Sequence, residues 1–186
     1  MIHIAGPKTP EKQGIPLIDT TSRSKTWSRG LSPFKLGPVN LYVPYKAKNV
    51  ENAWQFSKVY LEHINDNGDP SDEYFKWALT GWNDYKAHRY PMGKGAIPEY
   101  SWWDGKRLSY LEARKQIYIP LYSKAVLKSP VWPTLVKVYQ ENEHICLWDF
   151  DGYDYHNLNM SLKDVINDPY KKMGHAFVLA LLLEAL

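Results

Sequence analysis

Cysteine is almost absent from this chain of 186 residues, which holds one, Cys146, in the apolar run HICLWDF. One cysteine cannot form an intramolecular disulfide framework or a cysteine-rich zinc site. No charged-then-apolar leader opens the chain, and its longest apolar run, AFVLALLLEAL, includes a glutamate. That run is far shorter than the roughly 20 residues that cross a bilayer. We therefore expect a soluble, cytoplasmic protein with no membrane partner.

The familiar motifs of nucleotide, metal and esterase sites are also missing. The sequence has no internal repeat and no GxGxxG, GxxxxGK[ST], HExxH or GxSxG segment, so the sites that these motifs build have no support. The six histidines are scattered, and only His156 lies beside an acidic turn. We therefore expect a site with no metal and no cofactor.

Aromatic residues and unevenly placed charge are what the sequence has in quantity. Eight Trp and fourteen Tyr supply core area, and also faces on which flat ligands such as nucleobases stack. Residues 1–48 hold eight Lys/Arg against two acids, a net charge of +6, whereas the rest of the chain carries −3. A basic segment of this kind can bind phosphates, although it can equally be a solvated surface.

The length suits one domain. Residues 1–30 are rich in Pro, Gly, Ser, Thr and Lys without a sustained period, which predicts a basic extended arm ahead of a single domain over 31–186. The segment GPVNLYVPYKAK predicts a short edge strand or hairpin. HICLWDFDGYD predicts a buried strand that runs into an acidic turn. The expected fold class is α+β, mainly α-helical, with a small β element.

Helical spacing of apolar residues predicts five helical segments, over residues 49–65, 72–86, 109–129, 130–141 and 168–186. Asn49 and Ser71 are the expected caps of the first two. Pro120 predicts a kink or a break in the third. The last is expected to begin with Asp168 as its cap and Pro169 at its first position, and to form the central core. Residues 90–107, with three Gly and two Pro, are expected to be a long loop.

The stretch NVENAWQFSKVY, residues 49–60, carries the main functional signal. Glu51, Gln55 and Lys58 follow one another at spacings of four and three residues, which places them along one flank of a helix. Such a polar stripe is commonly just the solvated face of an amphipathic helix. Glu51 in the first turn behind a capping residue favours a functional interpretation instead.

This stretch resembles the signature of the NADAR family, in which an acid, an aromatic residue, a Gln and a Lys recur on one helix. In this sequence the four positions are Glu51, Trp54, Gln55 and Lys58. GLSPF at residues 30–34 resembles the Leu-Ser-Asn-Phe segment of that family, and KKMGHAFVLALL resembles its closing helix. The sequence departs from the family pattern at Asn52, where His is usual, and at Pro33, where Asn is usual.

The resemblance implies a NADAR-like fold and hydrolysis of an N-glycosidic bond, because NADAR proteins act on riboflavin-pathway intermediates or remove ADP-ribose from guanine. Glu51 would stabilise positive charge at the sugar or transfer a proton. Lys58 would attack the anomeric carbon and form a Schiff base with the opened sugar. With the basic segment, this predicts a hydrolase acting on a modified base or nucleotide, in DNA, as a DNA glycosylase or an ADP-ribosyl-guanine hydrolase.

Further residues are expected to complete the site, although each Trp can be core and each acid a turn former. The expected substrate-binding residues are Phe34, Trp54, Gln55, Trp102, Trp103, Asp149, Asp151 and His175. The expected DNA contacts are Arg23, Lys25, Arg29, Lys94, Lys106 and Arg107. The alternative is a non-catalytic module that binds single-stranded nucleic acid, in which Glu51 is only a helix-start acid. The number of subunits stays open.

Overall fold

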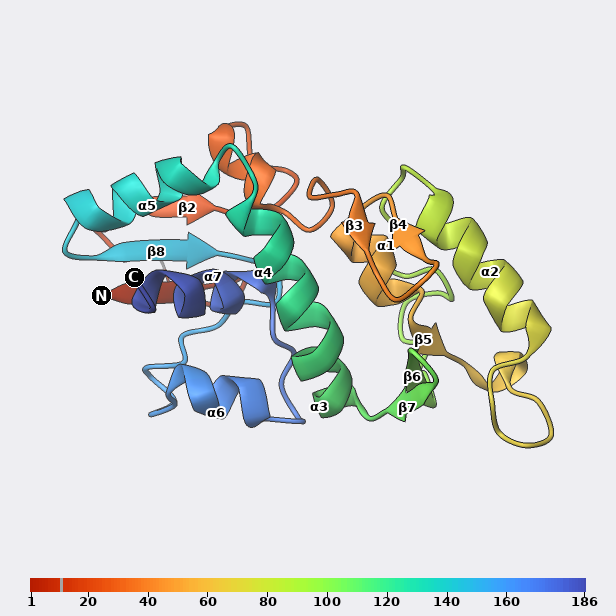
Figure 1. The fold of residues 1–186 in the computed structure, drawn as a ribbon. Helices are drawn as coiled ribbons and strands as arrows, with labels where there is room; N and C mark the ends of the chain where they lie inside the picture. Colours follow the sequence, from red (N-terminus) through yellow and green to blue (C-terminus); the bar gives the residue numbers. More distant parts are fainter. Residues whose placement is uncertain (11) are drawn as a thin grey trace. The chain divides into compact units, whose positions relative to one another are not determined.

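The structure, a computed structural model, describes residues 1–10 and 12–186. The chain divides into two compact units, which we call unit 1 (Met1–Lys35 and Tyr122–Leu186) and unit 2 (Leu36–Leu121). The chain contains both helices and strands, and its fold class is α+β as expected (Figure 1). The expected boundary at residue 30 is not observed, because residues 1–35 belong to the same unit as the end of the chain.

A three-stranded parallel sheet forms the centre of unit 1. Its order is β1 (Ile2–Ala5), β8 (Ile145–Trp148) and β2 (Leu17–Asp19), with β1 and β2 each parallel to β8. The residues of β1 and most of β8 are buried, as in parallel strands covered on both faces. The strand predicted from HICLWDF is therefore confirmed.

The prediction of an extended arm over residues 1–30 is wrong. This segment supplies two of the three strands of that sheet, and Ile2 and Ile4 are each 1% exposed. It then forms the short helix η1 (Trp27–Leu31). The Pro, Gly, Ser and Thr residues of this segment that suggested an extended arm belong mainly to the loops between these elements. The strands themselves are too short to show a period, and they are stabilised by β8 far along the chain.

Helices α5 (Trp132–Glu141), α6 (Leu162–Asn167) and α7 (His175–Glu184) belong to unit 1. The segment from Ala176 to Ala180 is fully buried and α7 packs on β1, which confirms a central final helix (Figure 1). The predicted start of that helix is wrong, because Asp168 instead ends α6. Helix α7 begins after Gly174, where a Cβ atom would lie 2.1 Å from the carboxylate of Asp149.

Unit 2 begins with the hairpin of β3 (Val39–Asn40) and β4 (Lys46–Ala47), which confirms the strand prediction for that segment. Helix α1 (Val50–Gln55) and helix α2 (Asp72–Asn83) follow. Both predicted caps are present, since the Asn49 side chain accepts from the Asn52 amide and the Ser71 side chain from the Tyr74 amide. The short helix η2 (Leu61–His63) lies between them.

The predicted helix over 49–65 is too long. It ends at Gln55, and Lys58 lies in a strand, β5 (Lys58–Val59), that pairs with β6 (Tyr100–Trp103). Phe56 ends the helix with its ring against α2, where a Cβ on Gly81 would be 2.2 Å from the ring. The residue that caps the end of α1 thus packs against a residue far along the chain.

The predicted loop over 90–107 is also too long. Residues 100–108 form a hairpin of β6 and β7 (Lys106–Leu108), so that the antiparallel sheet has the order β5-β6-β7. Its turn is Asp104–Gly105, with φ of 48° and 78°. Two consecutive residues with positive φ are typical of the tight hairpin turns that an Asp-Gly pair favours. That dipeptide was the signal in the sequence for this hairpin.

A helical run leads from unit 2 into unit 1. It consists of α3 (Tyr110–Ala113), the π-helical turn η3 (Arg114–Tyr118) and α4 (Ile119–Leu127). The irregularity expected at Pro120 appears as this π turn, which ends two residues before the proline, while Pro120 itself lies in the first turn of α4. Among the described residues, no helix has both the length and the apolar character that crossing a bilayer requires.

Candidate functional site

Three side chains of unit 2 form a hydrogen-bonded row, which we call the acid–amide–amine row. The Gln55 amide nitrogen donates to Glu51 Oε1 at 3.0 Å. Lys58 Nζ donates to Gln55 Oε1 at 2.9 Å. Gln55 thus presents its donor to the carboxylate and its acceptor to the amine, the only amide orientation that satisfies both neighbours.

Glu51 does not lie on a solvated helix face. It is 6% exposed and Gln55 is 9% exposed, whereas Lys58 is half-buried. Charged and amide side chains are rarely buried unless they are hydrogen-bonded. The three side chains are neighbours, but the prediction that they share one helix is wrong, because Lys58 reaches the row from strand β5.

An aromatic pair lines the amine end of the row. Lys58 Nζ lies 5.1 Å from the ring centroid of Trp54, within the range of a cation–π interaction. On α1 the Trp54 ring also contacts the ring of Tyr118, at 5.2 Å between centroids. Tyr118 comes from the π turn of the next helical run. The Trp54 ring therefore packs against Lys58 and Tyr118. A base could stack only on the part of the ring that remains exposed.

The two tryptophans of β6 lie beside the strand that carries Lys58. Ser101 is the register partner of Lys58, and the Trp102 amide donates to the Ser57 carbonyl at 2.8 Å. The ring of Trp103 contacts Tyr42, with 5.1 Å between centroids. Both tryptophans are partly exposed. The hairpin thus fixes the backbone of Lys58 by strand pairing. The Trp102 and Trp103 side chains belong to the strand that pairs with it.

Asn52, a residue that the sequence did not single out as functional, ties another segment to α1. It is fully buried. Its amide nitrogen donates to the carbonyls of Asp84 and Lys86 at 3.0 and 2.8 Å, and its carbonyl accepts from the His88 amide at 2.8 Å. A mid-helix Asn is an unfavourable helix former, which was the one hint of such a role. The segment 84–88 is thereby fixed to helix α1.

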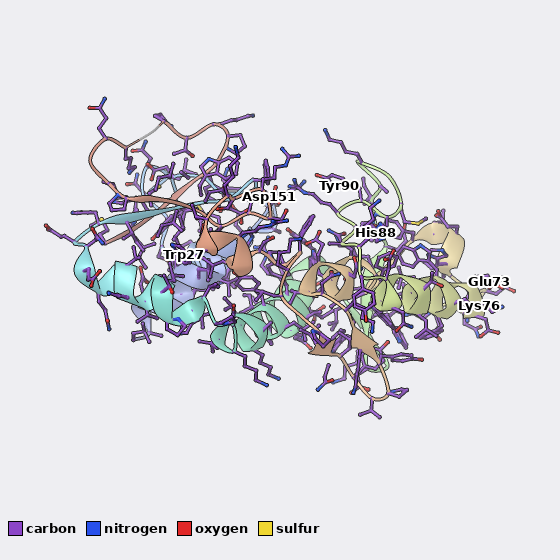
Figure 2. The ribbon with its side chains drawn as sticks, turned by 90° about the horizontal axis from the view of Figure 1, so that it is seen from above. Trp27, Glu73, Lys76, His88, Tyr90 and Asp151 are labelled. Carbon is purple, nitrogen blue, oxygen red and sulfur yellow. The ribbon has the colours of Figure 1, made fainter. Side chains whose placement is uncertain are left out.

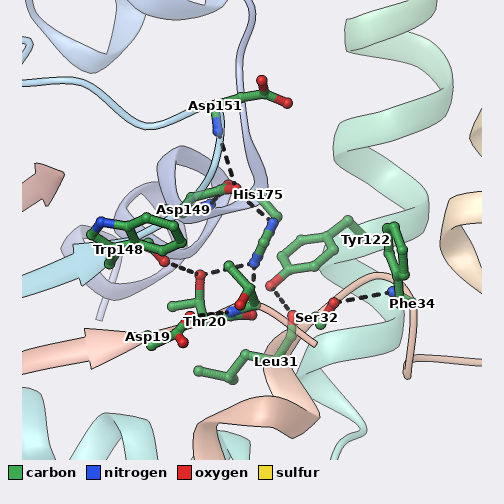
Figure 3. Close-up of polar contacts among 12 residues, drawn as sticks. Asp19, Thr20, Leu31, Ser32, Phe34, Tyr122, Trp148, Asp149, Asp151 and His175 are labelled. Atoms are coloured by element: carbon green, nitrogen blue, oxygen red, sulfur yellow. Dashed lines mark hydrogen bonds and ion pairs between the residues drawn. The ribbon is translucent and has the colours of Figure 1, made fainter. Parts of the chain in front are cut away.

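Unit 1 holds a second polar group, around His175 (Figure 3). Its Nδ1 lies 3.0 Å from Oδ2 of Asp149, while its Nε2 lies 2.9 Å from the carbonyl oxygen and 2.8 Å from the hydroxyl of Thr20. That hydroxyl donates to the Trp148 carbonyl. Because the carbonyl of Thr20 only accepts, Nε2 must carry a proton and cannot act as a base toward the threonine.

Asp149 balances this imidazole. Burial alone would raise the pKa of the Asp149 carboxyl. The charge of His175, the hydrogen bond to its ring and the hydrogen bonds from the backbone amides of Ala176 and Asp151 act in the other direction, and the pKa of Asp149 is lowered. Thr20, Asp149 and His175, which we call the His175 group, connect β2, β8 and α7 through these hydrogen bonds. Its arrangement is that of a satisfied polar core.

Asp151 and Phe34 are placed near this core by the backbone. The Asp151 amide donates to Asp149 Oδ1 at 3.4 Å, and the Phe34 amide donates to the Ser32 hydroxyl at 3.3 Å (Figure 3). Of the expected substrate-binding residues, the structure therefore brings together Asp149, Asp151 and His175 within unit 1. In unit 2 it brings together Trp54 and Gln55 with the expected catalytic pair.

Comparison with known proteins identifies the chain at the level of its family. Residues 8–178 match a family of unknown function, DUF6939. The chain belongs to this family. No curated protein and no solved structure matches it. The DUF6939 match spans the acid–amide–amine row and the His175 group alike.

The expected DNA contacts of this DUF6939 protein fall in both units. In unit 1, Arg23, Lys25 and Arg29 are exposed, and the Arg23 guanidinium lies 5.0 Å from the ring centroid of Phe150. In unit 2, Lys94 and Lys106 are exposed.

Arg107 differs from these cations, because its guanidinium is bonded within unit 2. It donates to the Asp69 carboxylate at 2.7 and 3.2 Å and to the Asn67 carbonyl at 3.1 Å. These bonds pin the β6–β7 hairpin to the turn before α2. In the ranges 1–10 and 12–186, no group of three or more His, Cys, Asp or Glu side chains is arranged to hold a metal ion.

Proposed function

We propose that this DUF6939 protein is a cytoplasmic hydrolase that cleaves the N-glycosidic bond of a modified nucleobase or nucleotide, with DNA as the expected carrier of the base. The observation that carries the proposal is the acid–amide–amine row, in which a buried carboxylate and a half-buried amine are linked through Gln55. The resemblance of the same residues to the NADAR signature supports this chemistry.

The two ends of the row suit the two needs of the reaction. Breaking the bond between the anomeric carbon and the base nitrogen builds positive charge on the sugar, which a carboxylate stabilises. The departing nitrogen takes up a proton, which Glu51 can supply and later recover. A lysine amine that has lost its proton is a nucleophile for the anomeric carbon. Each group has a role that the other cannot fill.

In the proposed reaction, the neutral Nζ of Lys58 attacks the anomeric carbon as the bond to the base breaks. The sugar ring opens and Nζ forms an imine with it, while the base leaves with its added proton. Water then adds to the imine carbon and the bond to Nζ breaks, which returns the amine and releases the sugar. Gln55 bonds to the carboxylate and to the amine and so holds the two groups at fixed positions along the row.

Trapping of the imine tests this proposal. Borohydride is added during turnover of a panel of modified DNAs and ADP-ribosylated guanine substrates, and peptide mapping locates the reduced adduct. We expect it at Lys58, and we expect Lys58→Arg to abolish trapping because arginine does not give up its proton. Lys76→Arg, at an exposed position of α2, is the matched control and should trap as the wild type does.

A second measurement separates the roles. Glu51→Gln should lower base release, followed by mass spectrometry, by about two to four orders of magnitude. Trapping that persists in Lys58→Arg would show that another amine forms the imine and would rule out Lys58 as the nucleophile. If base is still released in that variant without any adduct, Glu51 acts on a water molecule directly. Absence of base release from every substrate would overturn the proposed activity.

The alternative is a non-catalytic module that binds single-stranded nucleic acid. The exposed cations of unit 1, with Arg23 beside the Phe150 ring, favour it. Such a module would retain modified and plain DNA equally and release no base from either. Measuring retention and release on the same samples therefore distinguishes the two functions.

A further inference from the structure

The segment 84–90 of unit 2 is rigidly attached to the helix that carries Glu51. Besides the three hydrogen bonds of Asn52, the Asn49 side chain donates to the Tyr85 carbonyl at 3.4 Å. The N-cap residue of α1, Asn49, and a residue within the helix, Asn52, thus bind the backbone of one short segment. A segment fixed to the helix that carries the proposed acid is placed to hold a substrate in a defined position.

This segment and the residues after it are basic. Between residues 85 and 98 the sequence has Lys86, Arg89 and Lys94 and no Asp or Glu. The carboxylate of Asp84, just before it, already accepts from the Lys86 amide at 2.8 Å and contacts the His88 ring at 2.6 Å. Residues 85–98 themselves supply no acid to Lys86 or Lys94, and both side chains are exposed, which favours a polyanion as their ligand.

Exposed tyrosines lie among these cations. Tyr85 is 80% exposed and Tyr90 is 42% exposed. Lys48 Nζ lies 4.5 Å from the ring centroid of Tyr85 and 3.2 Å from its hydroxyl, and the Arg89 guanidinium lies 5.3 Å from the ring centroid of Tyr90. Rings held by cations at the surface offer a face for base stacking and adjacent charge for phosphates.

We propose that residues 84–94, which we call the basic tyrosine segment, bind single-stranded nucleic acid, with a base on Tyr85 and phosphates at Lys86 and Lys94. Figure 2 shows His88 and Tyr90 on this segment, away from Lys76 and Glu73 on α2. The combination of stacking rings with cations favours a nucleic acid strand over an acidic protein, which offers no flat bases. The inference that this strand is the substrate rests on the proposed glycosidase function.

Binding is tested apart from catalysis, by fluorescence anisotropy of a labelled single strand of about 12 nucleotides at several salt concentrations. Tyr85→Ala should weaken binding by about fivefold or more, since a stacked base is lost. The double variant Lys86→Ala/Lys94→Ala should reduce the slope of log affinity against log salt by about 1.4, or about 0.7 per lost phosphate contact. Lys76→Ala and Leu79→Ala, both exposed on α2, are the controls and should bind as the wild type does.

The outcomes for the segment and for the enzyme are distinct. Unchanged affinity and salt slope in both segment variants would overturn the proposal, as would a wild-type protein that cleaves free nucleotides but does not bind the strand. Weakened binding in the variants, together with no base release by the wild type, would support the segment and overturn the glycosidase. Circular dichroism and thermal unfolding of each variant exclude loss of folding as the cause of weaker binding.

Discussion

His175 and Asp149 form a buried ion pair in unit 1, with Nδ1 and Oδ2 3.0 Å apart and each side chain 6% exposed. Both ring nitrogens face acceptors, because Nε2 also meets the Thr20 carbonyl. The ring is therefore the doubly protonated imidazolium when all three contacts are made. A charge buried in this way depends on its counter-ion.

Asp149→Asn should lower the free energy of unfolding at neutral pH by about 3–5 kcal/mol, because it removes the charge that balances a buried imidazolium. Denaturant unfolding measures it. Asp151→Asn is the control, since that carboxylate is only half-buried. Equal stability of the Asp149→Asn variant and the wild type would show that the ring is neutral in the fold.

The same carboxylate makes stability depend on acid. The pKa of Asp149 is lowered in the folded state, so its stabilisation is present above the unfolded value, about 3.9, and is lost as pH falls through the folded value. Unfolding curves between neutral pH and about pH 3 should show that the wild type loses more stability than Asp149→Asn. Parallel curves for the two proteins would contradict this assignment.

Gln55→Leu should reduce the free energy of unfolding by about 3 kcal/mol, because two hydrogen bonds to charged groups disappear in a buried place. It should also lower borohydride trapping at Lys58, since the amine is no longer held. Gln116→Leu makes the same replacement at an exposed position and should change stability by less than about 0.5 kcal/mol. Normal trapping in Gln55→Leu would mean that the amide does not position Lys58.

Asn52→Ala should loosen segment 84–88 while α2 stays protected. The change deletes three hydrogen bonds to that backbone, so amide hydrogen exchange of Lys86 and His88 should accelerate. Asn83→Ala, at an exposed residue near the end of α2, is the matched control. Exchange that is unchanged in the Asn52 variant would show that other contacts hold the segment.

Gly81→Ala should destabilise unit 2, although alanine is normally the better helix former by about 1 kcal/mol. The added Cβ would lie 2.2 Å from the Phe56 ring, and overpacking of this kind costs about 1–3 kcal/mol. Thermal unfolding measures the loss, with Thr80→Ala at the exposed neighbouring position as a control. Adding Phe56→Leu to the Gly81 variant should recover part of the stability. A stabilised Gly81→Ala protein would contradict the packing described.

Features encoded within a few neighbouring residues could be predicted from the sequence. The capping of α2 by Ser71, the hairpin of β3 and β4 and the buried strand β8 each depend on a local pattern and are observed. The spacing of Glu51, Gln55 and Lys58 predicted that the three lie along one helix, whereas Lys58 joins the other two from strand β5.

What the sequence did not predict depends on partners far along the chain. Strand β1 is four residues long and is recognisable only through its pairing with β8. At the early end of α1, Phe56 packs against Gly81, a residue far along the chain. Asn52 has a role only because the segment 84–88 returns to α1. None of these contacts produces a periodic pattern or a sequence motif in the residues that form it.

The position of β8 between β1 and β2 has a consequence for synthesis of the chain on the ribosome. The first strand is made early, but its pairing partner at residues 145–148 is translated late. Unit 2 is one continuous stretch, Leu36–Leu121, and has no such delay. In nascent chains, unit 2 should therefore fold while the apolar segment IHIA, residues 2–5, is still unpaired. We expect a chaperone to bind that segment until β8 has been synthesised.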